Sequence, residues 1–174
     1  ILVYSYHFLD ANACASLLES SLCLTTLSAM RTPTHRTGII TAVNYQHSDG
    51  ALHFYSLSLV TPDWLLTQSI TTRSYVGQST LDIITDVLAN YDFDWQLSEA
   101  LLSSEPLHQP LALRTQSDIS DYAFITGLLA DIGISTLWVA GDSTDDLGYL
   151  SLVNTLDALE LLPLDSRYAQ DSIQ

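Results

Sequence analysis

The chain has 174 residues, 47% apolar and 14% charged, and its 20 acidic residues against five arginines and no lysine give a net charge of −15. A field of this sign repels phosphate backbones and anionic lipid, so neither nucleic acid nor a membrane surface is expected as a partner. No apolar stretch approaches the ~20 residues that a membrane-spanning helix needs. Cys14 and Cys23 are too few for a disulfide framework and are predicted to be core thiols.

The first sixty residues are predicted to form β-strands. Short runs rich in β-branched and aromatic residues, one of them with alternating polarity, are typical of strands. An Asp49-Gly50 pair between the last two runs suits a tight hairpin turn. The link 28–37, which contains Pro33, is predicted to be a loop. The expected strands are residues 1–8, 22–27, 38–43 and 52–60.

The N-terminus begins inside an apolar run, without Met and without a basic segment. This start does not match a signal peptide. A chain that opens within a strand is expected to be a fragment of a longer protein.

Two helices are predicted farther along the chain. Apolar residues recur at helical spacing over 79–90, after Ser79 or Thr80 as N-cap, and Asn90 is expected to end this helix. A second apolar stripe runs over 117–132, where Asp118 is the expected N-cap and Gly133 the expected C′ residue. Asp121 would lie in its first turn, where the helix dipole favours an acid.

A β-hairpin is predicted after the second helix, with strands 134–140 and 147–153 joined by an acidic turn. The tail after Pro163 is polar and is expected to fray. Strands followed by helices and then a hairpin indicate an α+β fold in which strands dominate.

No residue pattern predicts a catalytic, cofactor-binding or metal site. His47, Asp49 and His53 could supply metal ligands, but their spacing fixes no shared face, and two exposed strand histidines are the favoured interpretation. The acidic run from Asp142 to Asp146 lacks the Gly and Glu of an EF-hand loop, so a solvated turn is expected. Nucleophile elbows, phosphate loops and dinucleotide fingerprints are missing from the sequence.

Several short motifs occur together in a fixed order. His35 to Thr41 precedes a strand, which is followed by Pro62-Asp63-Trp64-Leu65-Leu66 and then Arg73-Ser74-Tyr75. The predicted helix with Ile83-Ile84 comes next, then Leu113 to Asp118, and the run closes at Ile132-Gly133-Ile134. Over about residues 35–140 this order resembles the N-terminal hub region of the VgrG family, the spike proteins of type VI secretion, which are related to baseplate hub proteins of contractile phage tails.

The resemblance implies a fold and a function. The fold would consist of β-barrel-like modules with two packed helices: 1–75 as a first module, truncated at its N-terminus, 76–165 as a helix-containing module with the hairpin, and 166–174 as a polar tail. The function would be that of a structural hub, without enzymatic activity, acting as a homotrimer that contacts a tail-tube protein, the C-terminal spike region and effectors. Assembly in the bacterial cytoplasm and export by the machine are implied as well.

Trp64, Leu65 and Leu66 are predicted to form a buried anchor, in the core rather than at a subunit contact. Two other functions stay open. A carbohydrate- or peptide-binding β module would present clustered exposed aromatic residues, and an acid-dependent hydrolase would need two carboxylates in a cleft.

Overall fold

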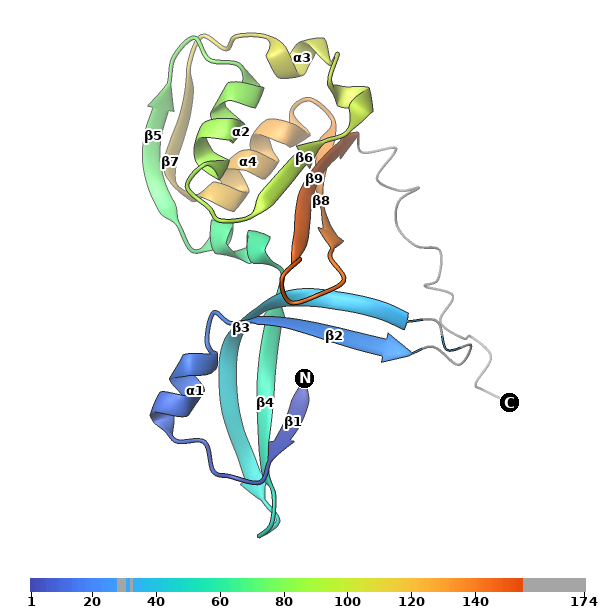
Figure 1. The fold of residues 1–174 in the computed structure, drawn as a ribbon. Helices are drawn as coiled ribbons and strands as arrows, with labels where there is room; N and C mark the ends of the chain where they lie inside the picture. Colours follow the sequence, from blue (N-terminus) through green and yellow to red (C-terminus); the bar gives the residue numbers. More distant parts are fainter. Residues whose placement is uncertain (28–30, 32, 155–174) are drawn as a thin grey trace, which may run out of the picture. The chain divides into compact units, whose positions relative to one another are not determined.

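The structure is a computed structural model that describes residues 1–27, 31 and 33–154 (Figure 1). Two compact units divide it: Ile1–Ser69 with Trp138–Leu150, and Ile70–Leu137 with the chain from Ser151 onward. The predicted tail 166–174 lies outside the described residues. Among the described residues no helix is both long enough and apolar enough to span a bilayer.

The first unit is built on a curled four-stranded sheet in the order β1-β4-β3-β2. All neighbouring strands are antiparallel, and the 16-residue β3 pairs with β2 through its first half and with β4 through its second. The strands are β1 (Leu2–Ser5), β2 (Ser21–Leu27), β3 (Pro33–Ser48) and β4 (His53–Val60). The predicted strands are therefore present, with β1 shorter and β3 longer than expected.

The predicted loop 28–37 is wrong in its second part, because β3 begins at Pro33 and pairs with Leu27 of β2. Proline lacks a backbone N–H, but the first residue of a strand tolerates that loss. The predicted hairpin turn is confirmed: Gly50 has a φ of 95°, and Asp49 Oδ1 accepts hydrogen bonds from the N–H groups of Ala51 and Leu52.

A helix that the sequence analysis missed, α1 (Ala11–Leu17), follows β1, and Asp10 caps its first turn. In Figure 1 it lies beside β3. A 3-10 segment, η1 (Pro62–Thr67), follows β4 and contains the predicted anchor. Leu66 is buried there, as expected, whereas Trp64 and Leu65 are half-buried.

The core of the first unit is small. Its buried apolar residues come from β3, β4, η1 and β9, namely Ile39, Ile40, Tyr55, Leu57, Leu66 and Leu150. Gly38 allows β3 and β4 to approach closely, because a Cβ there would stand 2.3 Å from the carbonyl oxygen of Val60. Cys14 and Cys23 are free thiols, half-buried rather than in the core.

The turn of the predicted C-terminal hairpin, with the adjoining strand ends from Trp138 to Leu150, belongs to this unit. The strands are β8 (Ile134–Ala140) and β9 (Gly148–Asn154), both close to the expected bounds. The carbonyl of Leu147 accepts hydrogen bonds from Thr37 Oγ1 at 2.7 Å and from Trp138 Nε1 at 3.1 Å. Thr37 lies in β3 and is buried, so this carbonyl ties the hairpin to the sheet.

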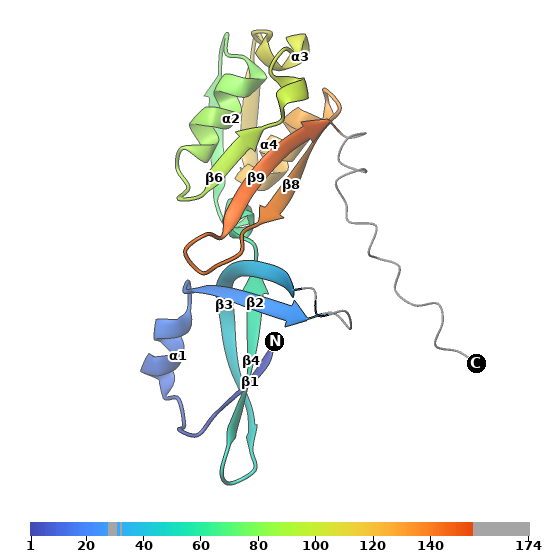
Figure 2. The ribbon, with the colours of Figure 1, turned by 45° about the vertical axis from the view of Figure 1, so that its right-hand side comes forward.

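The second unit places two helices between two groups of strands, as Figure 1 shows. On one side β5 pairs with β7, and in the three-stranded sheet β9 lies between β6 and β8 (Figure 2). The elements not yet given are β5 (Ile70–Tyr75), α2 (Thr80–Leu88), β6 (Asp94–Leu97), η2 (Glu99–Leu101), α3 (Glu105–His108), β7 (Arg114–Ser120) and α4 (Asp121–Ala130). The core is supplied mainly by the two helices, through Ile83, Ile84, Val87, Leu88, Phe124, Ile125, Leu128 and Leu129.

The first predicted helix is confirmed as α2. Ser79 is its N-cap and forms a capping box with Asp82: Asp82 N–H donates to Ser79 Oγ, and Ser79 N–H donates to the Asp82 carboxylate. The Ser79 hydroxyl, which also donates to the Asp82 carboxylate, and the Ser79 N–H lower the pKa of Asp82. Asn90 closes the other end, where its side-chain amide donates to the carbonyls of Asp86 and Val87.

The second predicted helix is present as α4, but its expected start is wrong. Residues 117–120 belong to β7, and the N-cap is Ser120, whose Oγ accepts from Ala123 N–H. Asp118, the expected cap, instead has a φ of 51° within the strand. Asp121 does lie in the first turn, and Gly133, with a φ of 73°, follows the C-cap Asp131 by two residues. The fold class is confirmed as α+β with strands dominant.

Candidate functional site

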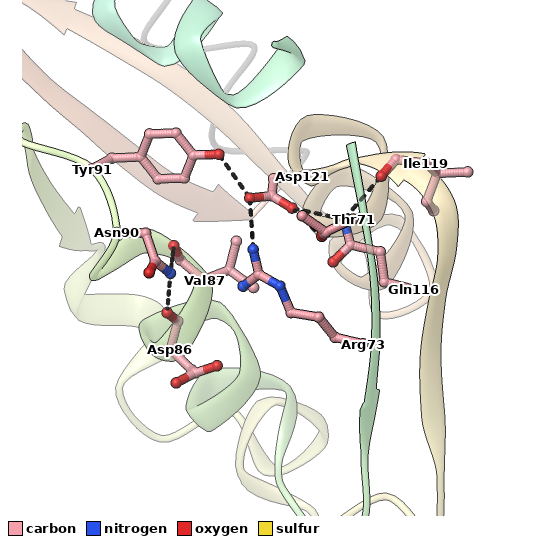
Figure 3. Close-up of polar contacts among 9 residues, drawn as sticks. All are labelled: Thr71, Arg73, Asp86, Val87, Asn90, Tyr91, Gln116, Ile119 and Asp121. Carbon is pink, nitrogen blue, oxygen red and sulfur yellow. Dashed lines mark hydrogen bonds and ion pairs between the residues drawn. The ribbon is translucent and has the colours of Figure 1, made fainter. Parts of the chain in front are cut away.

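Asp121 is the centre of a buried polar network in the second unit (Figure 3). Its side chain is fully buried, and both carboxylate oxygens accept two hydrogen bonds. Oδ1 accepts from Gln116 Nε2 at 2.7 Å and from Thr71 Oγ1 at 3.2 Å. Oδ2 accepts from Tyr91 OH at 2.7 Å and from Arg73 Nη2 at 3.3 Å. One carboxylate therefore connects β5, β7, α4 and the segment that follows α2.

The local sequence explains how Asp121 reaches this position. Ser120 ends β7 and caps α4, so the next residue starts the helix with its side chain near free backbone N–H groups, where a negative charge is favourable. A β-bulge precedes it: Thr71 pairs with Ile119 and Arg73 with Gln116, so that two β7 residues face Thr72 alone. The N–H of Asp118 donates to Thr72 Oγ1 and fixes this bulge.

The electrostatics of the network favour an ionised carboxylate. Burial by itself would raise the pKa of Asp121, but hydrogen bonds from Gln116 and Tyr91, the charge of Arg73 and the Thr71 hydroxyl together lower it. A buried carboxylate with four donors and one cation is satisfied in the sense that buried charges require. A general acid at neutral pH needs the opposite shift, so this arrangement stabilises structure and does not suit proton donation.

A second feature lies in the first unit, on one face of the sheet formed by β1, β4 and β3. Residues paired across antiparallel strands point to the same side. The register therefore places Tyr4, Phe54 and His47 in one row, and Leu2, Ser56 and Asn44 in the next row on the same side. We call the set Leu2, Tyr4, Tyr6, His47 and Phe54 the aromatic face.

The rings of the aromatic face contact one another. His47 stacks on Phe54 with ring centroids 4.5 Å apart, Tyr4 lies 6.4 Å from Phe54, and the Tyr6 ring meets Tyr4 edge-on. Leu2 and Tyr4 are 66% and 62% exposed, and Tyr6 is 74% exposed. Most of the aromatic face is therefore open to solvent, although Phe54 within it is half-buried.

The opposite side of the same strands is partly covered. Tyr55 points there and is 1% exposed, and its hydroxyl accepts a hydrogen bond from Leu9 N–H at 2.7 Å. Phe8 packs edge-on against Tyr45 and His53, so the segment before α1 lies over part of this side, where Phe8 and Tyr45 stay 62% and 48% exposed. Only one of the two sides of this sheet thus has a covering segment among the described residues.

The residues considered for a metal site do not come together. His47 lies on the aromatic face, whereas His53 points to the covered side, and Asp49 binds backbone N–H groups of its own turn, which lower its pKa. In the described part of the chain no three His, Cys, Asp or Glu residues gather in a way that could hold a metal ion. The run 142–146 forms the turn between β8 and β9, where Asp146 N–H donates to Ser143 Oγ.

The sequence analysis missed both features for identifiable reasons. Asp121 was recognised only as a partner of the helix dipole, because its donors lie 5 to 50 positions away along the chain. The aromatic face requires the β1-β4-β3 register, which depends on bulges at Ile40/Ala42 and Tyr45/His47. One sequence signal could have revealed it: Leu2 and Tyr4, like Phe54 and Ser56, are two positions apart and so point to the same side of a strand.

Comparison with solved structures shows the fold. The E. coli c3393 protein, described as a component of the type VI secretion system with similarity to the T4 bacteriophage tail proteins gp27 and gp5, matches with a TM-score of 0.68 and 20% identity over 88% of this chain and 40% of its own. A chain of the Francisella PdpA–VgrG complex in its half-lidded form matches with a TM-score of 0.67 and 11% identity over 92% and 26%. The chain thus spans less than half the length of these relatives.

A more distant match is the 43 kDa tail protein of prophage MuSo2 from Shewanella oneidensis, with a TM-score of 0.51 and 11% identity over 76% of this chain and 42% of that one. Among curated proteins no sequence matches. The family model of the phage tail baseplate hub (GPD) matches residues 7–161, which cover most of both units. The chain therefore belongs to the phage tail baseplate hub family.

Proposed function

We propose that this chain is a structural part of the hub of a contractile injection apparatus and acts by oligomeric assembly, without catalysing a reaction. The observation that carries the proposal is the family match over residues 7–161, in agreement with the fold shared with the c3393 protein and the Francisella complex. A hub transmits force and holds partners, so stable packing and exposed contact faces are the features it requires.

The Asp121 network supports a structural role. A carboxylate whose oxygens are both occupied by donors, and whose pKa is lowered, offers neither a proton nor a free coordination position. It links strands and helices that are far apart in the sequence, as a rigid platform needs. This argues against the acid-dependent hydrolase, for which a carboxylate with a raised pKa would be expected.

The proposed partners are further copies of the chain, in a homotrimer, a tail-tube protein, and the C-terminal spike region with its effectors. The Francisella relative was solved in a complex of two different proteins, which supports a place for a second kind of protein. The net charge of −15 does not suit nucleic acid or anionic lipid. Assembly in the bacterial cytoplasm followed by export is part of the same proposal.

We also keep the predicted domain organisation as a proposal, with 1–75 and 76–165 as the two modules and 166–174 as a tail. Limited proteolysis tests it. Cleavage near 75 and near 166 that leaves two resistant fragments would support these boundaries. Resistant peptides 1–69 and 138–150 that stay bound to each other after cleavage would replace them.

Light scattering after size exclusion tests the assembly proposal on the longest natural chain that contains these residues. We expect the mass of a trimer. A monomer at every concentration would overturn the proposal and direct attention to the alternative, a carbohydrate- or peptide-binding β module. The observation that favours this alternative is the row of Tyr4, Phe54 and His47, in which Tyr4 and His47 are exposed, since aromatic faces also bind sugars.

A further inference from the structure

The charges of the chain are unevenly distributed along the sequence. All 20 acids lie outside residues 20–48, whereas two of the five arginines, Arg31 and Arg36, lie within them. These residues comprise β2, β3 and the link between the two strands. One stretch is therefore net positive in a chain whose net charge is −15.

β2 and the first part of β3 form a two-stranded ribbon. Residues 33–38 pair with β2 and not with β4, whose pairing with β3 begins at Ile39. Figure 1 shows this part of β3 running beside β2 and away from β4. We call residues 22–27 and 33–38 the ribbon. Arg36 is exposed within it, and Arg31 is exposed in the link between its strands.

Arg36 points away from the acidic turn of its own unit. Thr37 and Cys23, which are paired across the ribbon, both donate hydrogen bonds to backbone carbonyls of the β8–β9 hairpin, at 2.7 and 3.6 Å. Their side of the ribbon therefore faces the hairpin, whose turn contains the acids of 142–146. Successive side chains on a strand point to opposite faces, so Arg36 lies on the other side of the ribbon.

Neither arginine of this stretch forms an ion pair with another described residue. The other two arginines in the described ranges each bind an aspartate: Arg73 binds Asp121 at 3.3 Å, and Arg114 binds Asp131 at 3.1 Å. A guanidinium group is weakly hydrated and its fork of N–H groups fits a carboxylate, which is why Arg is enriched at protein interfaces. Two unpaired, exposed arginines on a strongly acidic chain thus indicate a contact with carboxylates of a partner.

The chain itself carries a surface of this kind in its second unit. Residues 82–105 include α2, β6, η2 and the start of α3, and hold six acids without one Arg or Lys. None of these acids forms an ion pair within the part of the chain that the structure describes. We call this stretch the acidic segment. Its exposed acids are Asp82, Asp86, Asp92, Asp94, Glu99 and Glu105.

Opposite charges on two different regions of one chain suit a contact between copies. In a ring of identical chains, one surface of each copy meets a different surface of the next. Two copies with a charge of −15 repel each other unless their contact pairs opposite charges, which the ribbon and the acidic segment provide. A phosphate backbone or an anionic lipid could bind the same two arginines, but the 20 acids of the chain would repel it.

We propose that the ribbon of one copy binds the acidic segment of a neighbouring copy, with Arg31 and Arg36 paired to its carboxylates. The inference rests on the proposed oligomeric hub and specifies which two surfaces meet.

Carbodiimide coupling in the longest natural chain tests the contact. Arg36→Lys keeps the charge and supplies an amine in a stretch of 174 residues that has no lysine, and a carbodiimide joins this amine to a carboxylate in direct contact. Oligomers are assembled from unlabelled and ¹⁵N-labelled chains, coupled, digested and analysed by mass spectrometry. We expect peptide pairs of mixed isotope composition that join position 36 to the acidic segment.

Arg114→Lys is the matched control for the coupling. Arg114 lies 3.1 Å from Asp131 of the same chain, in an exposed ion pair. Coupling at position 114 should therefore join peptides of a single isotope composition, which verifies that the reagent reports an ion pair within one chain.

Charge reversal gives the second readout. Arg36→Glu and Arg114→Glu change the net charge equally, so general repulsion between copies rises equally in both. Arg36→Glu should raise the dissociation constant of the oligomer about tenfold more than Arg114→Glu does. This difference should shrink at about 1 M salt, where the Debye length is only about 3 Å. Circular dichroism establishes that both variants fold; if Arg36→Glu does not, Arg36→Gln and Arg114→Gln replace the pair.

The outcomes separate the inference from the proposed function. An oligomer without mixed-isotope pairs from position 36, or with such pairs only to acids outside 82–105, overturns the inference and leaves the hub proposal standing. Equal dissociation constants for the two charge reversals at low salt overturn it as well. A chain that never associates overturns both. Mixed pairs between position 36 and the acidic segment, together with the larger loss of affinity in Arg36→Glu, would support the contact.

Discussion

The hydroxyl of Tyr91 donates a 2.7 Å hydrogen bond to the buried carboxylate of Asp121, thirty positions later in the chain. Tyr91 follows the end of α2 and Asp121 begins α4, so this single bond joins the C-terminal side of one helix to the N-terminus of the other. The remaining donors come from β5 and β7, and the unit is thereby connected around one acid.

Asp121→Asn should lower the free energy of unfolding by about 2–3 kcal/mol, because it removes a buried charge whose partners remain. The new amide group would also point N–H groups at donors such as Gln116 Nε2. Urea denaturation measures the change. Asp131→Asn, which breaks the exposed pair with Arg114, is the control and should change stability by less than about 1 kcal/mol.

The stabilisation by Asp121 should depend on pH. Its pKa in the folded protein is lowered relative to the unfolded chain, so the unfolded state binds the proton more readily. The contribution is therefore complete above the ordinary Asp value of about 3.9 and is lost as the pH falls through the lower folded pKa. The stability difference between the wild type and Asp121→Asn should be constant from pH 7 to 5 and shrink below about 4. A difference that grew on acidification would contradict the assignment.

Gly38→Ala should destabilise the first unit by about 1–3 kcal/mol, because the added methyl group meets the carbonyl of Val60 at 2.3 Å and forces β3 away from β4. Gly127→Ala is the matched variant in the second unit. It lies inside α4 with nothing within 4 Å of the new Cβ, and alanine there should stabilise by about 0.5–1 kcal/mol. Thermal unfolding of both variants checks the opposite signs, and two changes in the same direction would contradict this account.

The hydrogen bonds to the Leu147 carbonyl should be energetically coupled. Thr37→Val or Trp138→Phe removes one donor and leaves the other, so each should cost about 1 kcal/mol from that bond. The double variant removes both donors and should cost more than the sum of the single changes, by about 1 kcal/mol. A double-mutant cycle from urea denaturation measures the excess. Thr26→Val, at an exposed hydroxyl, is the control and should stay within about 0.5 kcal/mol.

The elements that the sequence predicts are those whose polarity pattern is local. Ser79, with Ile83, Ile84, Val87 and Leu88 behind it, defines α2 without reference to the rest of the chain. By contrast, residues 117–120 were assigned to α4 because a helical stripe runs through them, and only the partner strand β5 shows that they belong to β7. The seven-residue α1 and the four-residue β6 are too short to display a period.

Function was predictable to a different extent. The order of motifs around Pro62 to Leu66 and Leu113 to Asp118 indicates the hub family from the sequence alone, and the family match confirms it. The buried network could not be predicted, because the residues bound to Asp121 are common polar types at irregular spacing. Their convergence depends on a bulge and a cap that only the three-dimensional structure reveals.

The hairpin of β8 and β9 has a consequence for synthesis. The first unit consists of residues 1–69 and 138–150, so the Leu147 carbonyl that binds Thr37 leaves the ribosome long after the sheet it joins. During that interval the ribosome adds residues 70–137, and the nascent sheet lacks one of its packing elements. At about 5–20 residues per second the delay lasts several seconds, a period in which the exposed sheet is most vulnerable to aggregation and to chaperone capture.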